Sequence, residues 1–410
     1  MKKIFLKPKK DAAVRRFHPW IFSGAIATMD DGIADGEAVE VYSAHKDYLA
    51  TGHYQSNASI AIRLFSFTKT DAGQAFWTQK IRNAYQYRQQ LGLTQNPHTN
   101  CYRLVHAEGD GLPGLIIDIY DKTAVLQCHS IGMHTEKEKL TQSLLEVFDN
   151  QLTTIFDKSA DTLPDPYIKS VQNSYLYPHS SHSPIPPSPN SHISSHPPTL
   201  PSSLENDLPF RIDWEQGQKT GFFLDQRDNR NLLAQYAAHK TVLNTFAYTG
   251  GFSLYALRAG ATQVDSVDVS QKAINLLEEN VQNVGFTDRH HSYTQDVLKF
   301  LQQCENEYDI MIVDPPAFAK SIAKRHNAVQ GYKRLNALAM KKIKKGGMLF
   351  TFSCSQVVDN QLFYDTIVAA ALEAGRTARV MHHLTQAADH PVSLYHPEGA
   401  YLKGLALYLE

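Results

Sequence analysis

The chain is poor in cysteine, and its positive and negative charges almost cancel. Four cysteines occur among 410 residues, at positions 101, 128, 304 and 354, and none forms a Cys-x-x-Cys pair. This excludes a disulfide framework and a zinc-knuckle site, so we expect reduced thiols and no bound metal. The formal net charge of −1 excludes a histone-like polycation, so any nucleic-acid site must be a local patch.

The sequence lacks the apolar segments that membrane-spanning and secreted proteins carry. No run approaches the roughly 18 apolar residues that cross a bilayer, and no apolar segment follows Lys2 and Lys3 as it would in a signal peptide. The apolar content of 42% is that of an ordinary globular protein. We therefore expect a cytoplasmic globular protein of two or three domains, as either a monomer or a homodimer.

Changes in residue pattern divide the chain into four parts. Residues 1–73 contain short alternating segments broken by turn residues, which predicts a small closed β domain. Residues 74–177 combine a helical pattern with strand-like segments, which predicts an α+β domain. Residues 178–203 are rich in Ser, Pro and His, which predicts a disordered insert. Over 204–410 strands alternate with helices, which predicts an α/β domain with a doubly wound parallel sheet.

Individual elements follow from the same patterns. The expected strands are 37–43, 60–67, 101–108, 114–120, 123–129, 241–248, 263–270, 309–316, 348–355 and 400–410. The expected helices are 75–91, 135–150, 252–260, 271–285 and 334–347. Ligands of doubly wound sheets bind at the carboxyl ends of the strands, near the switch in strand order, so the candidate sites are sought there.

A glycine-containing turn follows the expected strand 241–248. Its segment, Asn244-Thr-Phe-Ala-Tyr-Thr-Gly250-Gly251-Phe, lets a ligand approach the backbone closely. Asp268 ends the next strand, where a carboxylate accepts both hydroxyls of a ribose. No pyrophosphate cradle of the G-x-G-x-x-G or P-loop kind occurs, which favours S-adenosylmethionine (SAM) over NAD. The alternative is a doubly wound sheet whose turn glycines are structural.

Two further motifs follow successive expected strands, which would lie side by side in a methyltransferase-type sheet. Asp314-Pro-Pro follows an apolar strand, and the rigid turn fixes a carboxylate at the sheet edge. Cys354 follows the next strand within Thr-Phe-Ser-Cys-Ser. A cysteine is commonly a small buried apolar residue, but beside Asp314 this one is interpreted as a nucleophile. A thiolate that adds to C6 of a pyrimidine makes C5 nucleophilic enough to take a methyl group, whereas methylation of a nitrogen needs no thiol.

Two segments outside the expected sheet also carry candidate residues. Residues 218–230 are aromatic and polar and precede the sheet, so they form either a lid over the ligand or a helix cap. The N-terminal basic run is either a solvated terminus or an RNA-binding surface. Its candidate RNA-binding residues are Lys7, Lys9, Lys10, Arg15 and Arg16.

Taken together, these segments resemble the SAM-dependent 23S ribosomal RNA cytosine-C5 methyltransferases of the large-subunit methyltransferase I type. The resemblance runs nearly end to end, apart from the 178–203 insert, and also rests on His-Pro-Trp-Ile-Phe-Ser-Gly near the N-terminus and on the segment 386–404. It implies a PUA-like RNA-binding domain over 1–73, an α+β linker domain, and a class I Rossmann-like methyltransferase domain.

The resemblance also implies functional residues. The implied cofactor-binding residues are Phe222, Gln226, Arg227, Asn244, Phe246, Tyr248, Thr249, Gly250, Gly251, Asp268, Ser270, Asp296 and Asp314. The implied catalytic residues are Cys354 and Asp314, acting on single-stranded or opened 23S RNA. Many such enzymes carry a second cysteine just after the Asp-x-Pro turn, where this chain has Ala317. Removal of the C5 proton is then left to another group, for which we suggest a water held near Asp314.

Two other functions remain open at this point. An RNA N-methyltransferase of the guanine N7 type shares the fold and the Asp-Pro-Pro turn but needs no thiol, so Cys354 would be structural. A SAM-binding RNA-binding module without activity is the second alternative, although such a protein would have no reason to keep Asp268, Asp314 and Cys354 together.

Overall fold

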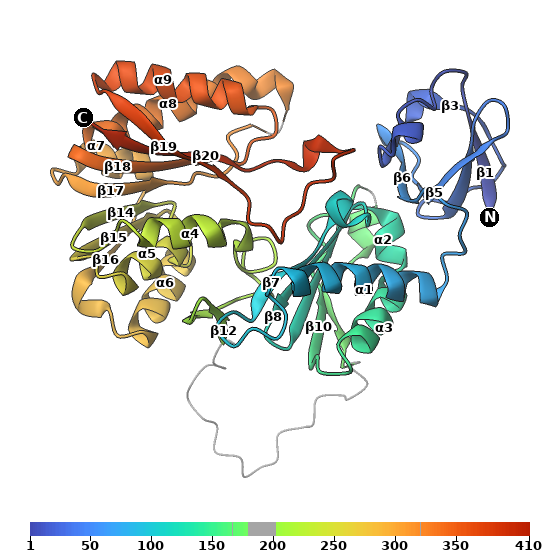
Figure 1. Cartoon of the computed structure of the whole chain (residues 1–410), viewed down its shortest axis with the longest axis horizontal. Helices are drawn as coiled ribbons and strands as arrows, with labels where there is room; N and C mark the ends of the chain where they lie inside the picture. The colour runs from blue at the N-terminus through green and yellow to red at the C-terminus, as the bar shows by residue number, and fades with distance from the viewer. Residues whose placement is uncertain (166, 179–201, 320) are drawn as a thin grey trace, which may run out of the picture. The chain divides into compact units, whose positions relative to one another are not determined.

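The computed structural model describes residues 1–165, 167–178, 202–319 and 321–410 (Figure 1). Most of the predicted insert, residues 179–201, lies outside this range. The predicted end of the insert was wrong, because Ser202 and Ser203 open strand β12 (Ser202–Glu205), which pairs with β13 (Leu208–Arg211). The turn between these strands, Asn206-Asp207, has positive φ at both residues, as tight hairpins require. No helix in the described part is long and apolar enough to cross a membrane.

The chain folds into two compact units, each assembled from separate segments. The first unit comprises Met1–Leu204, Ile212–Leu224 and Ala388–Gly399. The second comprises Glu205–Arg211, Asp225–Ala387 and Ala400–Glu410. This division differs from the four consecutive parts expected from the sequence, because short segments from the second half of the chain complete the first unit.

The N-terminal part of the first unit is a six-stranded sheet. Its strands are β1 (Lys2–Leu6), β2 (Trp20–Phe22), β3 (Ile26–Met29), β4 (Ala38–Tyr42), β5 (Tyr48–Tyr54) and β6 (Ile60–Ser66). They pair in the order β2-β6-β5-β4-β1-β3, with β1 and β4 parallel. The strands predicted over 37–43 and 60–67 are confirmed as β4 and β6. Alternate residues such as Val39 and Val41 are fully buried and form the core of this part.

The rest of the first unit packs helices on a second sheet. Its strands are β7 (Cys101–His106), β8 (Leu115–Tyr120), β9 (Thr123–Cys128), β10 (Thr154–Asp157) and β11 (Ser174–Tyr177), in the order β11-β10-β9-β8-β7. Its helices are α1 (Gln74–Gln90), α2 (Ile131–Thr135) and α3 (Lys137–Val147). The predicted helix 75–91 is confirmed. The helix predicted over 135–150 ends earlier, because Asp149 and Asn150 have positive φ.

The second unit is a seven-stranded sheet flanked by helices (Figure 1). Its strands are β14 (Thr241–Thr245), β15 (Gln263–Asp268), β16 (His290–Thr294), β17 (Tyr308–Val313), β18 (Ile343–Ser353), β19 (Ala378–Thr385) and β20 (Lys403–Leu409). Its helices are α4 (Arg227–Ala234), α5 (Gly251–Arg258), α6 (Gln271–Asn283), α7 (Val297–Gln303), α8 (Arg325–Lys341) and α9 (Asn360–Ala374).

The sheet of the second unit is parallel only in part. β16, β15, β14, β17 and β18 are parallel neighbours in that order, whereas β20 runs antiparallel to both β18 and β19. The predicted helix 334–347 was misplaced, since α8 begins at Arg325 and residues 343–347 already belong to β18. The positive φ of Gly346 falls in this first part of β18, where the pairing with β17 changes register.

Candidate functional site

The strand order of the second unit has its switch at β14. From β14 the chain adds β15 and β16 on one side, then returns to place β17 and β18 on the other. Thr245 is level with Val267 of β15 and with Val313 of β17, so the loops after these strands leave the same edge. Such an edge is where doubly wound sheets bind ligands.

The turn after β14 is tightly wound and tied to its neighbours. Phe246 and Tyr248 both have positive φ, at 55° and 46°. The N–H of Tyr248 donates to the Asp268 carboxylate at 2.9 Å, and the N–H of Ala247 donates to the Val267 carbonyl at 3.0 Å. The turn is therefore held against the end of β15 by both backbone and side chain.

Asp268 itself is half-buried and uses both oxygens to shape this edge. Its second oxygen accepts from the N–H of Ser270 at 2.9 Å. Ser270 in turn caps α6, because its hydroxyl accepts from the N–H of Ala273. Each carboxylate oxygen has two lone pairs, so Asp268 keeps the capacity to accept ligand hydroxyls while it holds the turn.

The turn fits an adenosine-type cofactor such as SAM. The Thr249 hydroxyl is buried and has no hydrogen-bond partner among the described residues, which calls for a polar group not supplied by the chain. Gly250 has φ +85°, and a Cβ built there would lie 2.8 Å from the Leu277 side chain. Only glycine therefore suits the position that opens α5.

Asp314 follows β17 and meets the N-terminal end of α4. Gln226 donates through Nε2 to Asp314 Oδ2 at 2.9 Å and accepts from Asn229 Nδ2 at 2.6 Å. Gln226 and Arg227 are both buried, at 2% and 5% exposure. The last residues of the segment 218–230 thus begin α4, and Gln226 orients the Asp314 carboxylate, whereas residues 218–224 belong to the first unit.

Cys354 lies in the loop after β18, directly beside the loop that carries Asp314. β18 and β17 are parallel neighbours, as predicted. The Ser355 hydroxyl donates to the Ala319 carbonyl at 2.7 Å, which ties the two loops together. Burial raises the pKa of the nearby Tyr332 hydroxyl to about 12, with charges on Cys354 and Asp314 also acting on it. The thiol and the carboxylate therefore share one neighbourhood.

Lys403, at the start of β20, is a residue of this neighbourhood that sequence reasoning missed. It is 6% exposed, and its ammonium donates to the carbonyls of Ser355 and Tyr401, each at 2.9 Å. Burial lowers the pKa of Lys403, and negative charge on Cys354 opposes that effect. The only sequence signal was its place in the C-terminal segment that resembles the family.

We expect Lys403→Met to raise the pKa of the Cys354 thiol, because a neighbouring cation stabilises the thiolate. The smaller thiolate fraction should slow iodoacetamide alkylation of Cys354 roughly threefold or more near neutral pH, and peptide mass spectrometry across a pH series measures this. Lys333→Met, which breaks a half-exposed ion pair with Glu373, serves as the control. An unchanged alkylation profile in Lys403→Met would contradict the prediction.

The other predicted cofactor residues have more varied positions. Asn244 is 1% exposed and donates to the Ser253 hydroxyl at 2.8 Å, so its side chain is used within the fold. Asp296 is exposed and caps α7 by accepting from the N–H of Lys299. Gly251 lies against the Arg230 side chain at the start of α5. Phe222 is buried in the first unit.

The five predicted RNA-binding residues lie in the first unit and are all exposed. Lys7 donates to the Gly24 carbonyl at 3.0 Å, and Arg16 to the Ala12 carbonyl at 3.3 Å. Arg15 forms ion pairs with Asp11 and Asp47, at 2.6 and 3.1 Å. Arg15 is thus partly neutralised within the domain, and the RNA-binding role of the group stays a prediction.

Comparison with known proteins identifies both parts of the chain. A family model described as S-adenosylmethionine-dependent methyltransferase matches residues 166–400, and a PUA-like domain model matches residues 4–67. Relatives named ribosomal RNA large subunit methyltransferase I occur in Alteromonas mediterranea, at 36% identity, and in Vibrio vulnificus, at 37% identity. Each alignment covers 98% of this chain, and 97% and 98% of the respective relative. The chain belongs to the ribosomal RNA large subunit methyltransferase I family.

Members of this family are SAM-dependent methyltransferases, so the cofactor expected from the sequence is confirmed. A solved structure of a putative SAM-dependent methyltransferase from Streptococcus mutans has the same fold, with a TM-score of 0.81 at 21% identity over the full length of both chains. A putative methyltransferase solved in complex with SAH matches equally well. The predicted architecture, a PUA-like domain followed by a methyltransferase fold, is thereby confirmed.

Within this methyltransferase we expect Asp268→Ala to weaken SAM binding about ten- to hundredfold. The change removes a charged acceptor and also frees the backbone of Tyr248 from the end of β15. Titration calorimetry with SAM measures the effect. Asp288→Ala, at a 75% exposed carboxylate in the same unit, should bind SAM like the unaltered protein. Equal SAM affinity for the two variants would remove Asp268 from the cofactor site.

Proposed function

We propose that this protein transfers a methyl group from SAM to C5 of a cytosine in 23S ribosomal RNA, with Cys354 as the nucleophile. The observation that carries the proposal is the pairing of Cys354 with Asp314 at adjacent parallel strand ends, joined through the Ser355–Ala319 hydrogen bond. A family member that methylated a ring nitrogen would have no chemical use for a thiol at this position.

The reaction follows from these two side chains. The Cys354 thiolate adds to C6 of the cytosine, while the Asp314 carboxyl hydrogen-bonds the base at N3 or its amino group. Bound SAM supplies the electrophilic methyl group that C5 then takes. A base, for which we suggest a water near Asp314, removes the C5 proton. The C6–S bond breaks as the C5=C6 double bond re-forms, and Cys354 leaves as a thiolate.

The relatives' names indicate ribosomal RNA of the large subunit as the substrate. The direction from which the thiolate attacks limits which RNA conformations can react. A nucleophile attacks C6 above the plane of the ring, which is covered by neighbouring bases in a helix. The target cytosine must therefore lie in a single-stranded or opened region, or be flipped out of its stack. The exposed basic residues of the PUA-like domain would hold the backbone of such an RNA.

Nucleoside mass spectrometry of unmodified 23S rRNA after incubation with the full-length protein and SAM tests the proposal. We expect 5-methylcytidine as the product. A methylated guanosine would overturn the proposed target atom and favour an N-methyltransferase. SAM binding without any methylated nucleoside would instead favour a binding module without activity.

A further inference from the structure

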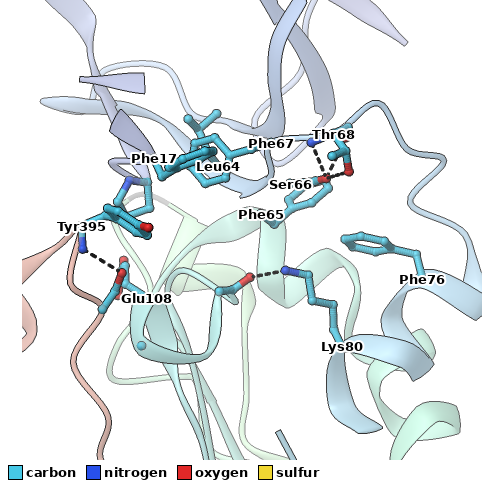
Figure 2. A pocket seen from close by; sticks show the side chains of 14 residues that line it. Phe17, Leu64, Phe65, Ser66, Phe67, Thr68, Phe76, Lys80, Glu108 and Tyr395 are labelled. Carbon is cyan, nitrogen blue, oxygen red and sulfur yellow. Dashed lines mark hydrogen bonds between the residues drawn. The ribbon is translucent and has the colours of Figure 1, made fainter. Parts of the chain in front are cut away.

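The first unit contains a hollow, of about 460 Å³, that the methyl-transfer reaction does not use. We call it the aromatic hollow. Its lining residues are Phe17, Pro19, Leu64, Phe65, Ser66, Phe67, Thr68, Phe76, Lys80, Glu108, Gly109, Gly111, Ser393 and Tyr395. They come from the PUA-like domain, from α1, from the loop after β7 and from the segment 388–399 (Figure 2). Its volume lies in the range of small-molecule and nucleotide sites.

Aromatic rings on one side of the hollow are left exposed. Phe17 is 47% exposed and Tyr395 54% exposed, and their ring centroids lie 5.2 Å apart. Phe17 also meets Phe67 edge to face, at 5.2 Å. Large rings exposed side by side at a concave surface indicate a ligand with a flat apolar face.

The backbone of Phe17 is in a conformation that bulky residues seldom adopt. Its φ and ψ are 62° and 20°, and it ends the short 3-10 helix Val14–Arg16 with an N–H donated to the Val14 carbonyl. Such strain is found where a side chain is held for a ligand.

The segment that carries Tyr395 is also held in place. The ring of the adjacent His396 packs against Trp20 at 4.3 Å, and Trp20 Nε1 donates to Glu108 at 2.8 Å. His18 Nδ1 lies 3.2 Å from the backbone nitrogen of Trp20, and His18 Nε2 lies 3.7 Å from a Glu398 carboxylate oxygen.

The opposite wall of the hollow carries a cation. Lys80 donates to the Gly111 carbonyl at 3.0 Å, and its ammonium lies 5.6 Å from the Phe76 ring (Figure 2). Burial lowers the pKa of Lys80 to about 8. An anion bound beside the ammonium would raise this pKa again, because it stabilises the charged form. Exposed Arg15 and Arg16 immediately precede Phe17 in the chain, and exposed Lys10 lies seven residues before it. Sites that bind single-stranded RNA commonly combine aromatic rings, on which bases stack, with cations that contact the phosphates.

We propose that the aromatic hollow binds one unpaired nucleotide of the RNA, with its base against Phe17 and Tyr395 and its phosphate near Lys80. This inference rests on the proposed RNA substrate, and it adds an RNA-binding site in a unit separate from the one that carries the methyl-transfer residues. The Glu108 carboxylate gives the hollow an acceptor for the amino or imino groups of a base.

Fluorescence anisotropy with the full-length protein and a labelled 12-nucleotide single-stranded RNA tests the inference. We expect Tyr395→Ala and Phe17→Leu each to raise the Kd about tenfold or more, since a stacked base contributes that much. Lys80→Met should raise the Kd and reduce the log–log salt slope by about 0.7. Leu394→Ala, at a 93% exposed neighbour outside the hollow, should bind RNA normally and serves as the control.

The outcomes separate this inference from the proposed function. Unchanged RNA affinity in both Tyr395→Ala and Phe17→Leu overturns the nucleotide site, and would leave the hollow to a peptide or another partner. If the ring variants lose RNA affinity but wild-type protein forms no 5-methylcytidine, the nucleotide site stands and the proposed reaction fails. Melting curves that match the wild type exclude misfolding of the variants, and Tyr395, in an exposed loop, keeps the test informative if Phe17→Leu misfolds.

Discussion

Cys354→Ala is expected to abolish formation of 5-methylcytidine while SAM binding stays within about twofold of the wild type. Loss of a covalent nucleophile commonly lowers the rate by at least about a thousandfold, because the remaining groups cannot activate C5. The side chain is small and half-buried, so its truncation should leave the fold intact. Nucleoside mass spectrometry gives the rate, and calorimetry gives the SAM affinity.

A matched control exists within the same unit. Cys304 is likewise half-buried but lies between α7 and β17, before the strand whose other end carries Asp314. Cys304→Ala should retain full activity. RNA that contains 5-fluorocytosine should trap a covalent adduct with the wild type and with Cys304→Ala, but not with Cys354→Ala. Full activity in Cys354→Ala would indicate that the methylated atom is a ring or exocyclic nitrogen and not C5.

Arg230→Met is expected to lower the free energy of unfolding by about 3–5 kcal/mol. Arg230 is 2% exposed and donates through Nε and Nη2 to the two oxygens of fully buried Glu205, at 2.8 and 2.7 Å. Burial acts to lower the pKa of Arg230, and the Glu205 carboxylate outweighs it and raises the pKa. Removal of the guanidinium therefore leaves a buried carboxylate without its main partner. Urea unfolding monitored by circular dichroism measures the loss.

Two further variants sharpen this measurement. Arg211→Met breaks the exposed ion pair with Glu279 in the same unit and should cost less than about 1 kcal/mol. The double variant Glu205→Met with Arg230→Met should regain part of the loss, since two apolar side chains replace a desolvated pair. If the Arg230→Met variant has the same free energy of unfolding as Arg211→Met, other groups such as Tyr255 are sufficient to stabilise the buried Glu205 carboxylate.

Sequence patterns located the strands whose ends carry Asp314 and Cys354, but they did not find the side chains that contact the loops after these strands. β17 was predictable because a central parallel strand is apolar on both faces, and Ile310 to Val313 are fully buried. Asp314 and Cys354 were then found from their place after β17 and β18. The contacts of Gln226 and Lys403 with these loops join residues 88 and 48 positions apart, and no local pattern reports such pairs.

The elements that sequence reasoning missed have similar causes. β19 shows little apolar alternation because most of its residues are partly or fully exposed, and α9 also exposes large apolar residues such as Leu372. The start of α8 was missed because polar and basic residues fill its first turn. The assignment of residues 388–399 to the first unit depends on tertiary packing, which is invisible to segment-by-segment interpretation.

That assignment also fixes an order of events during synthesis. The first unit takes residues 388–399, so it is incomplete until the ribosome has translated strands β14 to β19 of the second unit. The β-sheets of the first unit can form early, but Tyr395, His396 and Glu398 are translated only after β19. N-terminal domains usually fold first as separate units during translation. In this protein the wall of the aromatic hollow formed by Ser393 and Tyr395 can close only after strands β14 to β19 have been translated, so a nascent chain that ends before residue 388 lacks that wall.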